Sequence, residues 1–212
     1  MRPVLRLGCY HDHAVQDAPP FPESKMRLPK SFSLPVVAVL AIGCAAASHA
    51  RNSVAAATAI MYNTAGAPIG TAQLTQDANG SVFVDIASIS LPAGSHGIHF
   101  HAVGKCEGSA NPAFSTAGGH YNPMGKQHGL QNPNGPHAGD NPNFTVPASG
   151  VAEISFSTDR VSLTPGTTTL FDADGSSLVI HAGPDDQMSD PAGNSGGRIA
   201  CGVVRAGPGA AR

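Results

Sequence analysis

The sequence predicts an all-β fold, a sandwich or barrel of eight short strands. Eight segments show the alternation or the β-branched and aromatic enrichment of strands, and no long stretch follows the 3.6-residue period of a helix. The 212 residues include 25 glycines and 18 prolines, which suits short strands joined by many turns. We therefore expect one loop-rich β domain that is large enough to bury a substantial core.

The first fifty residues differ from the rest of the chain and are set apart from the fold. A basic segment over residues 26–30, an apolar run over 34–47 and a small-residue exit over 46–50 together predict a secretory signal. The apolar run is too short to span a bilayer. The chain is therefore divided into a non-native or mis-assigned extension over residues 1–25, a signal peptide over 26–50 and an exported domain over 51–212.

Within the signal, the segment Leu40-Ala41-Ile42-Gly43-Cys44 resembles a bacterial lipoprotein cleavage box. Cys44 would then be the lipidated residue and would anchor the protein to a membrane. In the other interpretation, Cys44 is discarded with the signal peptide and the protein is free in the periplasm. The sequence leaves both interpretations open.

The exported domain is mildly acidic and holds two cysteines. Residues 51–212 carry seven Lys or Arg against eleven Asp or Glu, which argues against nucleic acid as a partner because nucleic acid requires a basic face. Cys106 and Cys201 lie in this domain, and an even pair in an exported protein suggests a disulfide.

Turn signals separate the predicted strands. Strands over residues 55–62 and 70–75 flank a turn cluster, and Asn79-Gly80 introduces a third strand over 81–87, because both residues tolerate the positive φ of a tight hairpin turn. The other predicted strands cover residues 97–102, 143–146, 151–158, 177–181 and 198–204.

Two segments, 103–142 and 182–197, are too long and too rich in Gly, Pro, Asn, Asp and Ser for simple connections. Loops of this length in a compact domain are usually functional or disordered. Each begins directly after a strand that carries histidine, which indicates function.

Histidines on the strands and in the first loop predict a metal centre. His99 and His101 project from the same strand face, about 7 Å apart. The following loop adds three imidazoles and a carboxylate, and the strand over 177–181 ends in one more imidazole: His120, His128, His137, Asp140 and His181. Nitrogen and oxygen ligands of this kind suit zinc, and a metal could supply the order that an irregular loop lacks.

Five motifs together resemble the copper-zinc superoxide dismutases, especially the bacterial exported forms. The motifs are GIHFH, GGHYNPMGKQHG, GPHAGD, LVIHAGPDD and GNSGGRIACGV, and the match extends from about residue 54 to 205. The resemblance implies an eight-stranded Greek-key β-sandwich or barrel with two long functional loops. It also implies an exported enzyme that converts superoxide to oxygen and hydrogen peroxide.

The resemblance assigns one copper and one zinc to each chain. The copper ligands would be His99, His101, His120 and His181. The zinc ligands would be His120, His128, His137 and Asp140. His120 would bridge the two ions through its two ring nitrogens, and the disulfide would join Cys106 to Cys201.

The resemblance also assigns roles to residues around the metals. Arg198 would draw the anion toward copper, and His120 would take part in catalysis by releasing a proton. Asp185 would link a copper histidine to a zinc histidine, although the adjacent Asp186 could take this place. His96 would brace the site without binding metal, and its parity places it on the strand face opposite His99.

The implied chemistry is Cu(II)/Cu(I) cycling, with zinc in a structural and electrostatic role. The alternatives are a noncatalytic dismutase-like copper buffer or carrier, and a zinc hydrolase or structural zinc domain. The complete set of metal ligands together with Arg198 disfavours a carrier, and no carboxylate is evident as the base that a zinc hydrolase would need. Lys105 and Lys126 either steer the substrate or are solvated surface residues, and the sequence is compatible with both a monomer and a homodimer.

Overall fold

The computed structural model describes residues 53–210, which form ten strands and one turn of 3-10 helix. The strands are β1 (Ser53–Asn63), β2 (Pro68–Asp77), β3 (Val82–Ser90), β4 (Gly94–His96), β5 (Ile98–His101), β6 (Phe144–Val146), β7 (Val151–Thr158), β8 (Ser177–His181), β9 (Arg198–Val203) and β10 (Arg205–Ala206). The helical turn is η1 (Ser115–Ala117). The predicted all-β fold class is confirmed, whereas the expected extension, signal and Cys44 lie outside the described residues.

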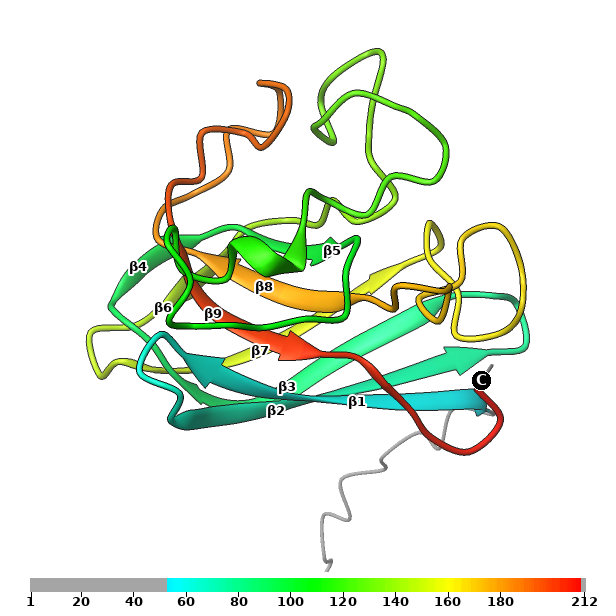
Figure 1. Cartoon of the computed structure of the whole chain (residues 1–212), viewed down its shortest axis with the longest axis horizontal. Coiled ribbons are helices and arrows are strands. Elements are labelled where there is room, and N and C mark those ends of the chain that lie inside the picture. The colour runs from blue at the N-terminus through cyan, green and yellow to red at the C-terminus, as the bar shows by residue number, and fades with distance from the viewer. Residues whose placement is uncertain (1–52, 211–212) are drawn as a thin grey trace, which may run out of the picture. The chain divides into compact units, whose positions relative to one another are not determined.

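One curled antiparallel sheet contains most of the strands, in the order β5-β8-β9-β1-β2-β3-β7, with β10 paired to β1 (Figure 1). A separate ribbon pairs β4 with β6. Because β4 precedes the edge strand β5 and β6 precedes the other edge strand β7, this ribbon connects the two edges of the sheet. The connections from β3 to β4 and from β7 to β8 pass between strands that are not neighbours, as in a Greek key.

Alternation of side chains along the strands builds the core. In β7 the burial pattern alternates from exposed to buried over its first five residues, and β1 shows the same period. The inward-facing residues include Leu74 of β2, Val84 of β3, Phe100 of β5 and Ile180 of β8, and all of these are fully buried. This core holds the strands that carry the metal-binding side chains.

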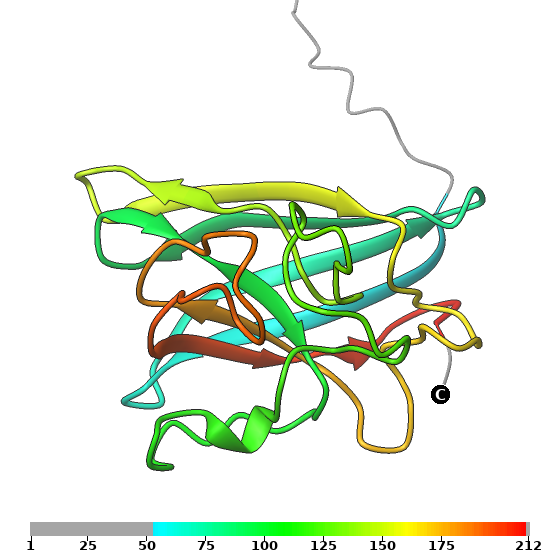
Figure 2. The ribbon, with the colours of Figure 1, turned by 90° about the horizontal axis from the view of Figure 1, so that it is seen from above.

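Two long connections cover the same side of the sheet. The β5–β6 loop spans residues 102–143 and the β8–β9 loop spans residues 182–197. Figures 1 and 2 show both loops, in green and orange, on the side where β5 and β8 lie. Among residues 53–210, no helix has the length and apolar character needed to cross a bilayer.

Candidate metal centre

Strands β5 and β8 place three histidines on the outer side of the sheet. In β5, Ile98 and Phe100 point into the core, so His99 and His101 point away from it. Their ring centroids lie 6.5 Å apart. His181 ends β8, the neighbour of β5, and its ring centroid lies 4.9 Å from that of His99. All three side chains are nevertheless buried, because the two long loops cover them.

The β5–β6 loop follows the free edge of β5. Because β5 is an edge strand, its unpaired backbone groups are available to the loop. Phe100 N–H donates to the Gly139 carbonyl at 2.9 Å, and the Phe100 carbonyl accepts from Tyr121 N–H at 2.8 Å. These bonds place His120 and Asp140 beside the β5 histidines.

The first cluster contains four histidines with ring nitrogens directed at one another. One nitrogen of each residue lies within 4.8 Å of the corresponding nitrogens of the other three. These residues are His99, His101, His120 and His181. Each has one buried ring nitrogen without a hydrogen-bond partner: Nδ1 of His99, and Nε2 of His101, His120 and His181. An unpaired buried polar atom is costly, so four of them around one point fit a metal ion.

The second cluster is built around one carboxylate oxygen. Asp140 Oδ1 lies 2.9 Å from His120 Nδ1, 3.0 Å from His128 Nδ1 and 3.4 Å from His137 Nδ1. Asp140 Oδ2 is held by the N–H groups of Gly129 and His137. Three nitrogens and one oxygen at these distances form a donor set that could hold a second ion.

His120 belongs to both clusters. Its Nε2 is one of the unpaired nitrogens of the first cluster, and its Nδ1 faces Asp140 in the second. A deprotonated imidazole has a lone pair on each nitrogen, so this side chain could bridge two ions.

Asp185 connects the clusters through the outer nitrogens of two histidines. Its Oδ2 lies 2.7 Å from His99 Nε2, and its Oδ1 lies 2.9 Å from His128 Nε2. The Gln187 N–H donates to the same Oδ1, and the Asn143 side chain exchanges two hydrogen bonds with the backbone of Asp185. Its position therefore orients the histidines of both clusters.

Burial favours the neutral form of three of the four histidines in the first cluster. Burial lowers the pKa of His120 to about 4 and that of His181 to about 3. Burial, and then the neighbouring His120, hold the pKa of His101 well below its usual value. Neutral imidazoles are the form that binds metal.

The second cluster shows the opposite balance. Burial alone would lower the pKa of His128, but hydrogen bonds to Asp140 and Asp185 outweigh it and raise the pKa to about 9. Burial would likewise raise the pKa of Asp140, but its histidine partners hold that pKa far below its usual range. Without a metal, this cluster is a histidine–carboxylate network.

Comparison with known proteins identifies the family of this chain. The sequence profile of the copper/zinc superoxide dismutase (SODC) family matches residues 68–204. The chain belongs to the copper/zinc superoxide dismutase family. It is 45% identical over 147 residues to "Superoxide dismutase [Cu-Zn] 1" of Aquifex aeolicus (strain VF5), an alignment that covers 68% of this chain and 85% of the relative.

Other members of the dismutase family match most of their own length. "Superoxide dismutase [Cu-Zn]" of Deinococcus radiodurans is 37% identical over 187 residues, which are 82% of this chain and 97% of the relative. The crystal structure of a "SOD-like protein" from Bacillus subtilis superposes with a TM-score of 0.64 at 35% identity and covers 69% of this chain and 96% of that chain. The resemblance inferred from the motifs is therefore confirmed.

In this dismutase-family chain, Arg198 lies at the start of β9 beside the first cluster. Its Nη1 donates to the Phe114 carbonyl and its Nη2 to the Gly118 carbonyl, each at 2.6 Å. The Gly118 carbonyl also lies 3.0 Å from His101 Nδ1. Arg198 lines a hollow of about 270 Å³ together with Gly196, whose carbonyl lies 3.2 Å from His181 Nδ1. The hollow therefore adjoins one group that contacts His181, and Arg198 is linked to His101 through the Gly118 carbonyl.

The Cys106–Cys201 disulfide joins the β5–β6 loop to β9, as predicted. Its Cα atoms lie 5.6 Å apart. Cys201 packs in a small apolar cluster with Phe114, Ala117 and Val179. The loop segment that holds Arg198 is therefore connected to the sheet both covalently and by packing.

His96 lies in β4 and not in the same strand as His99, so the parity expected from one continuous strand does not apply. Its Nδ1 lies 2.8 Å from the His181 carbonyl and its Nε2 lies 2.9 Å from the Pro92 carbonyl. His96 thus contacts the backbone of a cluster residue, and its own ring nitrogens face carbonyls.

Three other predicted residues lie outside the clusters. Lys105 pairs with Glu107 at 2.8 Å, and both side chains are about half exposed. Lys126 is exposed in the β5–β6 loop. The Asp186 carboxylate accepts from the N–H groups of Met188 and Ser189 within its own loop, so Asp185 is the carboxylate between the clusters.

Sequence reasoning missed Asp190, Gln187 and Gly193 of the β8–β9 loop. Asp190 Oδ1 accepts from His128 N–H at 2.6 Å. A Cβ on Gly193 would overlap Asp185 Oδ1 and lie 2.6 Å from His128 Nε2. The acidic composition of the loop was the one signal for Asp190, and it did not identify a partner.

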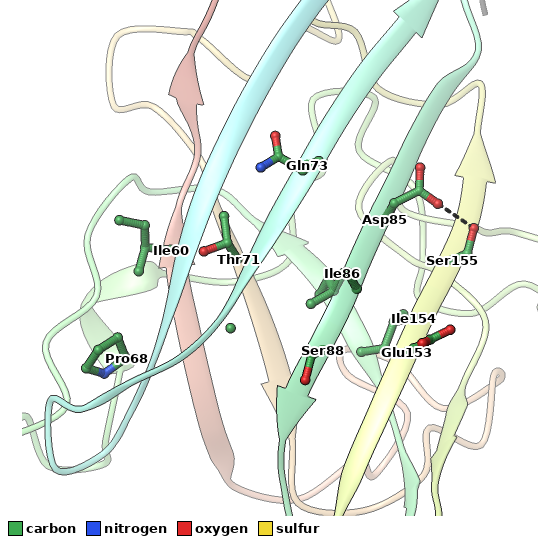
Figure 3. A pocket seen from close by; sticks show the side chains of 12 residues that line it. Ile60, Pro68, Thr71, Gln73, Asp85, Ile86, Ser88, Glu153, Ile154 and Ser155 are labelled. Atoms are coloured by element: carbon green, nitrogen blue, oxygen red, sulfur yellow. Dashed lines mark hydrogen bonds between the residues drawn. The ribbon is translucent and has the colours of Figure 1, made fainter. Parts of the chain in front are cut away.

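A hollow of about 620 Å³ lies elsewhere, over the outer face of β1, β2, β3 and β7 (Figure 3). Its lining includes Thr71, Gln73 and Glu153, and Ser155 donates to Asp85 at 2.6 Å. The lining contains none of the clustered histidines. The two histidine clusters therefore lie apart from this hollow.

Proposed function

We propose that this protein is an exported superoxide dismutase. The enzyme is an oxidoreductase of the copper/zinc superoxide dismutase family, in keeping with its curated relatives. The observation that carries the proposal is the pair of buried clusters that share His120, with four unpaired ring nitrogens directed at one point.

The donor atoms support a different metal for each cluster. The first cluster offers four imidazole nitrogens, which suit a copper ion: His99, His101, His120 and His181. The second offers three nitrogens and one oxygen, a set that tetrahedral zinc accepts: His120, His128, His137 and Asp140. We expect one copper and one zinc per chain.

Copper, when bound, would supply one-electron chemistry in which one superoxide is oxidised to oxygen and a second is reduced, with two protons, to hydrogen peroxide. The residues of the chain bring the anion and the protons to that place. Arg198 lines the hollow next to Gly196, whose carbonyl contacts His181, so its positive charge would attract the anion there. His120 can hold or release a proton at Nε2, the nitrogen that faces the first cluster.

The second cluster has a structural role in this proposal. It joins the β5–β6 loop to itself through His120, His128 and His137, and Asp185 extends the network to His99. Because zinc has one stable oxidation state, electron transfer remains with the first cluster.

The test measures dismutase activity and metal content on the same purified sample, before and after reconstitution with copper and zinc. We expect activity that follows copper, at about one copper and one zinc per chain. The His181→Ala variant should lose copper and activity but keep most zinc, because His181 belongs to the first cluster only. Equal loss of both metals would contradict the assignment.

The same experiment separates the enzyme from a copper buffer or carrier. If both clusters bound their metals and no dismutase activity appeared, the assignment of the metal sites would be supported and the catalytic role would be rejected. A dismutase-like binding protein would then be the better account, and the Bacillus subtilis structure carries the name "SOD-like".

We further propose that residues 26–50 direct export and that residues 51–212 are the exported domain, with 1–25 a non-native or mis-assigned extension. The mass of the protein recovered from the cell envelope tests this division and shows whether Cys44 carries lipid. Sedimentation of the same material distinguishes a monomer from a homodimer.

A further inference from the structure

The outer nitrogens of most clustered histidines have strong partners. Asp185 takes those of His99 and His128, and backbone carbonyls take those of His101 and His181. The outer Nε2 of His137 instead faces Asp190 Oδ1 at 3.7 Å. Asp190 belongs to the β8–β9 loop, which contributes no residue to either cluster.

The same carboxylate oxygen makes a second contact with the second cluster. Asp190 Oδ1 accepts from His128 N–H at 2.6 Å, a short bond between residues 62 positions apart. One oxygen therefore touches the backbone of one clustered histidine and faces the ring of another. Both contacts restrict where His128 and His137 place their inner nitrogens.

We propose that Asp190 is a positioning residue for the second cluster and strengthens its hold on a divalent ion. This inference rests on the proposed function only in that the second cluster binds zinc. The physical basis is that a carboxylate near the outer nitrogen of a ligand histidine orients the ring and makes its inner nitrogen a better donor.

The exposure of Asp190 limits the size of the effect. Its side chain is 48% exposed, and exposed ion pairs are weak because water screens them. The short bond to the His128 backbone carries the larger part of the positioning. Loss of outer-shell partners lowers metal affinity by about 10-fold to 100-fold, and we expect the lower end of this range here.

Asp186 provides a matched control in the same loop. Its carboxylate accepts from Met188 N–H at 2.9 Å, from Ser189 N–H at 2.8 Å and from Asn194 Nδ2 at 2.9 Å. None of these partners belongs to either cluster. Asp186→Asn removes the same charge from the same loop without changing a contact to a clustered histidine.

The experiment compares Asp190→Ala, Asp190→Asn and Asp186→Asn in the full chain. Zinc affinity is measured by competition with a chromophoric chelator, and the ligand field is followed by the visible absorption of cobalt(II) in the second cluster. Asp190→Ala should weaken zinc about tenfold and shift the cobalt bands. Asp190→Asn should fall between it and the unsubstituted protein, because the amide oxygen can still accept from His128 N–H.

The controls separate this inference from simpler explanations. Asp186→Asn should bind zinc like the unsubstituted protein, and copper binding should be unchanged in all three variants. An unchanged zinc affinity in Asp190→Ala, or an equal loss in Asp186→Asn, would overturn the inference and leave the dismutase proposal intact. Absence of zinc binding by the unsubstituted protein would overturn both. Should Asp190→Ala fail to fold, an Asp190→Asn variant with unchanged affinity and cobalt bands would overturn the inference.

Discussion

At the scale of single residues, the partner of the outer nitrogen decides which ring nitrogen a histidine presents. His99 presents Nδ1, because Asp185 takes its Nε2. His101 and His181 present Nε2, because backbone carbonyls take their Nδ1 atoms. The first cluster therefore depends on residues outside it for its choice of donor atom.

Gly193 leaves room for the Asp185 carboxylate, which is one of these partners. Substitution of Gly193 gives the first prediction. It has a φ of 61°, and a Cβ there would overlap Asp185 Oδ1. Gly193→Ala should therefore displace the Asp185 carboxylate from His128. We expect a loss of unfolding free energy of about 1 to 3 kcal/mol, together with weaker zinc binding. Thermal unfolding and zinc titration measure the two effects.

Gly125 offers the matched control for that substitution. Its φ is 62°, but a Cβ there would meet nothing within 4 Å. Gly125→Ala therefore adds the backbone strain alone, about 1 kcal/mol. Equal effects of the two substitutions on zinc binding would show that contact with Asp185 does not matter.

At the scale of elements, the strands supply rigid positions and the loops supply the remaining ligands. Alternation in β5 directs Phe100 into the core and His101 out of it, so one strand serves both packing and the site. The β5–β6 loop has little core of its own. Its order comes from pairing with the edge of β5, from the disulfide and from the second cluster.

Reduction of the Cys106–Cys201 disulfide gives the second prediction. The bond joins residues 95 positions apart. In the loop-entropy account, closing a loop of that size stabilises a fold by up to about 4 to 5 kcal/mol. Reduction should therefore lower the melting temperature and loosen the segment that holds Arg198. Thermal unfolding of reduced and alkylated protein measures this, and an unchanged melting temperature after reduction verified by mass would refute it.

The strands could be predicted where local pattern alone decides them. The bounds predicted for β7 and β8 are those observed. The strand predicted over 97–102 corresponds to β5, and β4, which ends just before Gly97, was not predicted. Gly97 lies against His99 and Asp185, where a Cβ would come within 3.1 Å of the His99 ring. The alternation of polar and apolar residues near Gly97 gives no sign that the β8–β9 loop approaches here.

The same distinction applies to the site. Histidine spacing and the family motifs predicted the members of both clusters, and the structure brings all of them together. The roles of Asp190 and Gln187 depend on contacts between loops that lie far apart in sequence. A single sequence carries no signal for such pairs beyond residue type.

At the scale of the described domain, both long loops cover the site on the sheet. His99, His101 and His128 are then fully buried, and the unpaired nitrogens of the first cluster are shielded from water. We therefore expect a bound metal ion to stabilise this arrangement of the loops, because it would satisfy atoms that water cannot reach. Without metal, we expect four histidines with shifted pKa values to make stability depend on pH: His101, His120, His128 and His181.

The third prediction concerns that dependence in protein kept metal-free by a chelator. Histidine has a pKa near 6.5 when exposed, but burial lowers that of His120 to about 4 and that of His181 to about 3, and that of His101 also lies well below 6.5. Between pH 6.5 and 4 these histidines therefore bind protons in the unfolded chain but not in the folded chain. Stability should fall with decreasing pH, by at most about 1.4 kcal/mol per pH unit for each histidine.

His128 has its pKa raised to about 9, so its effect on stability has the opposite sign. Its contribution to stability is complete below pH 6.5 and is lost as pH rises through 9. Urea midpoints from pH 5 to 9 should therefore peak near pH 6.5. The acid limb should become shallower in His181→Ala, whereas stability that stays level or rises between pH 6.5 and 5 would show that these imidazoles are not buried in the metal-free fold.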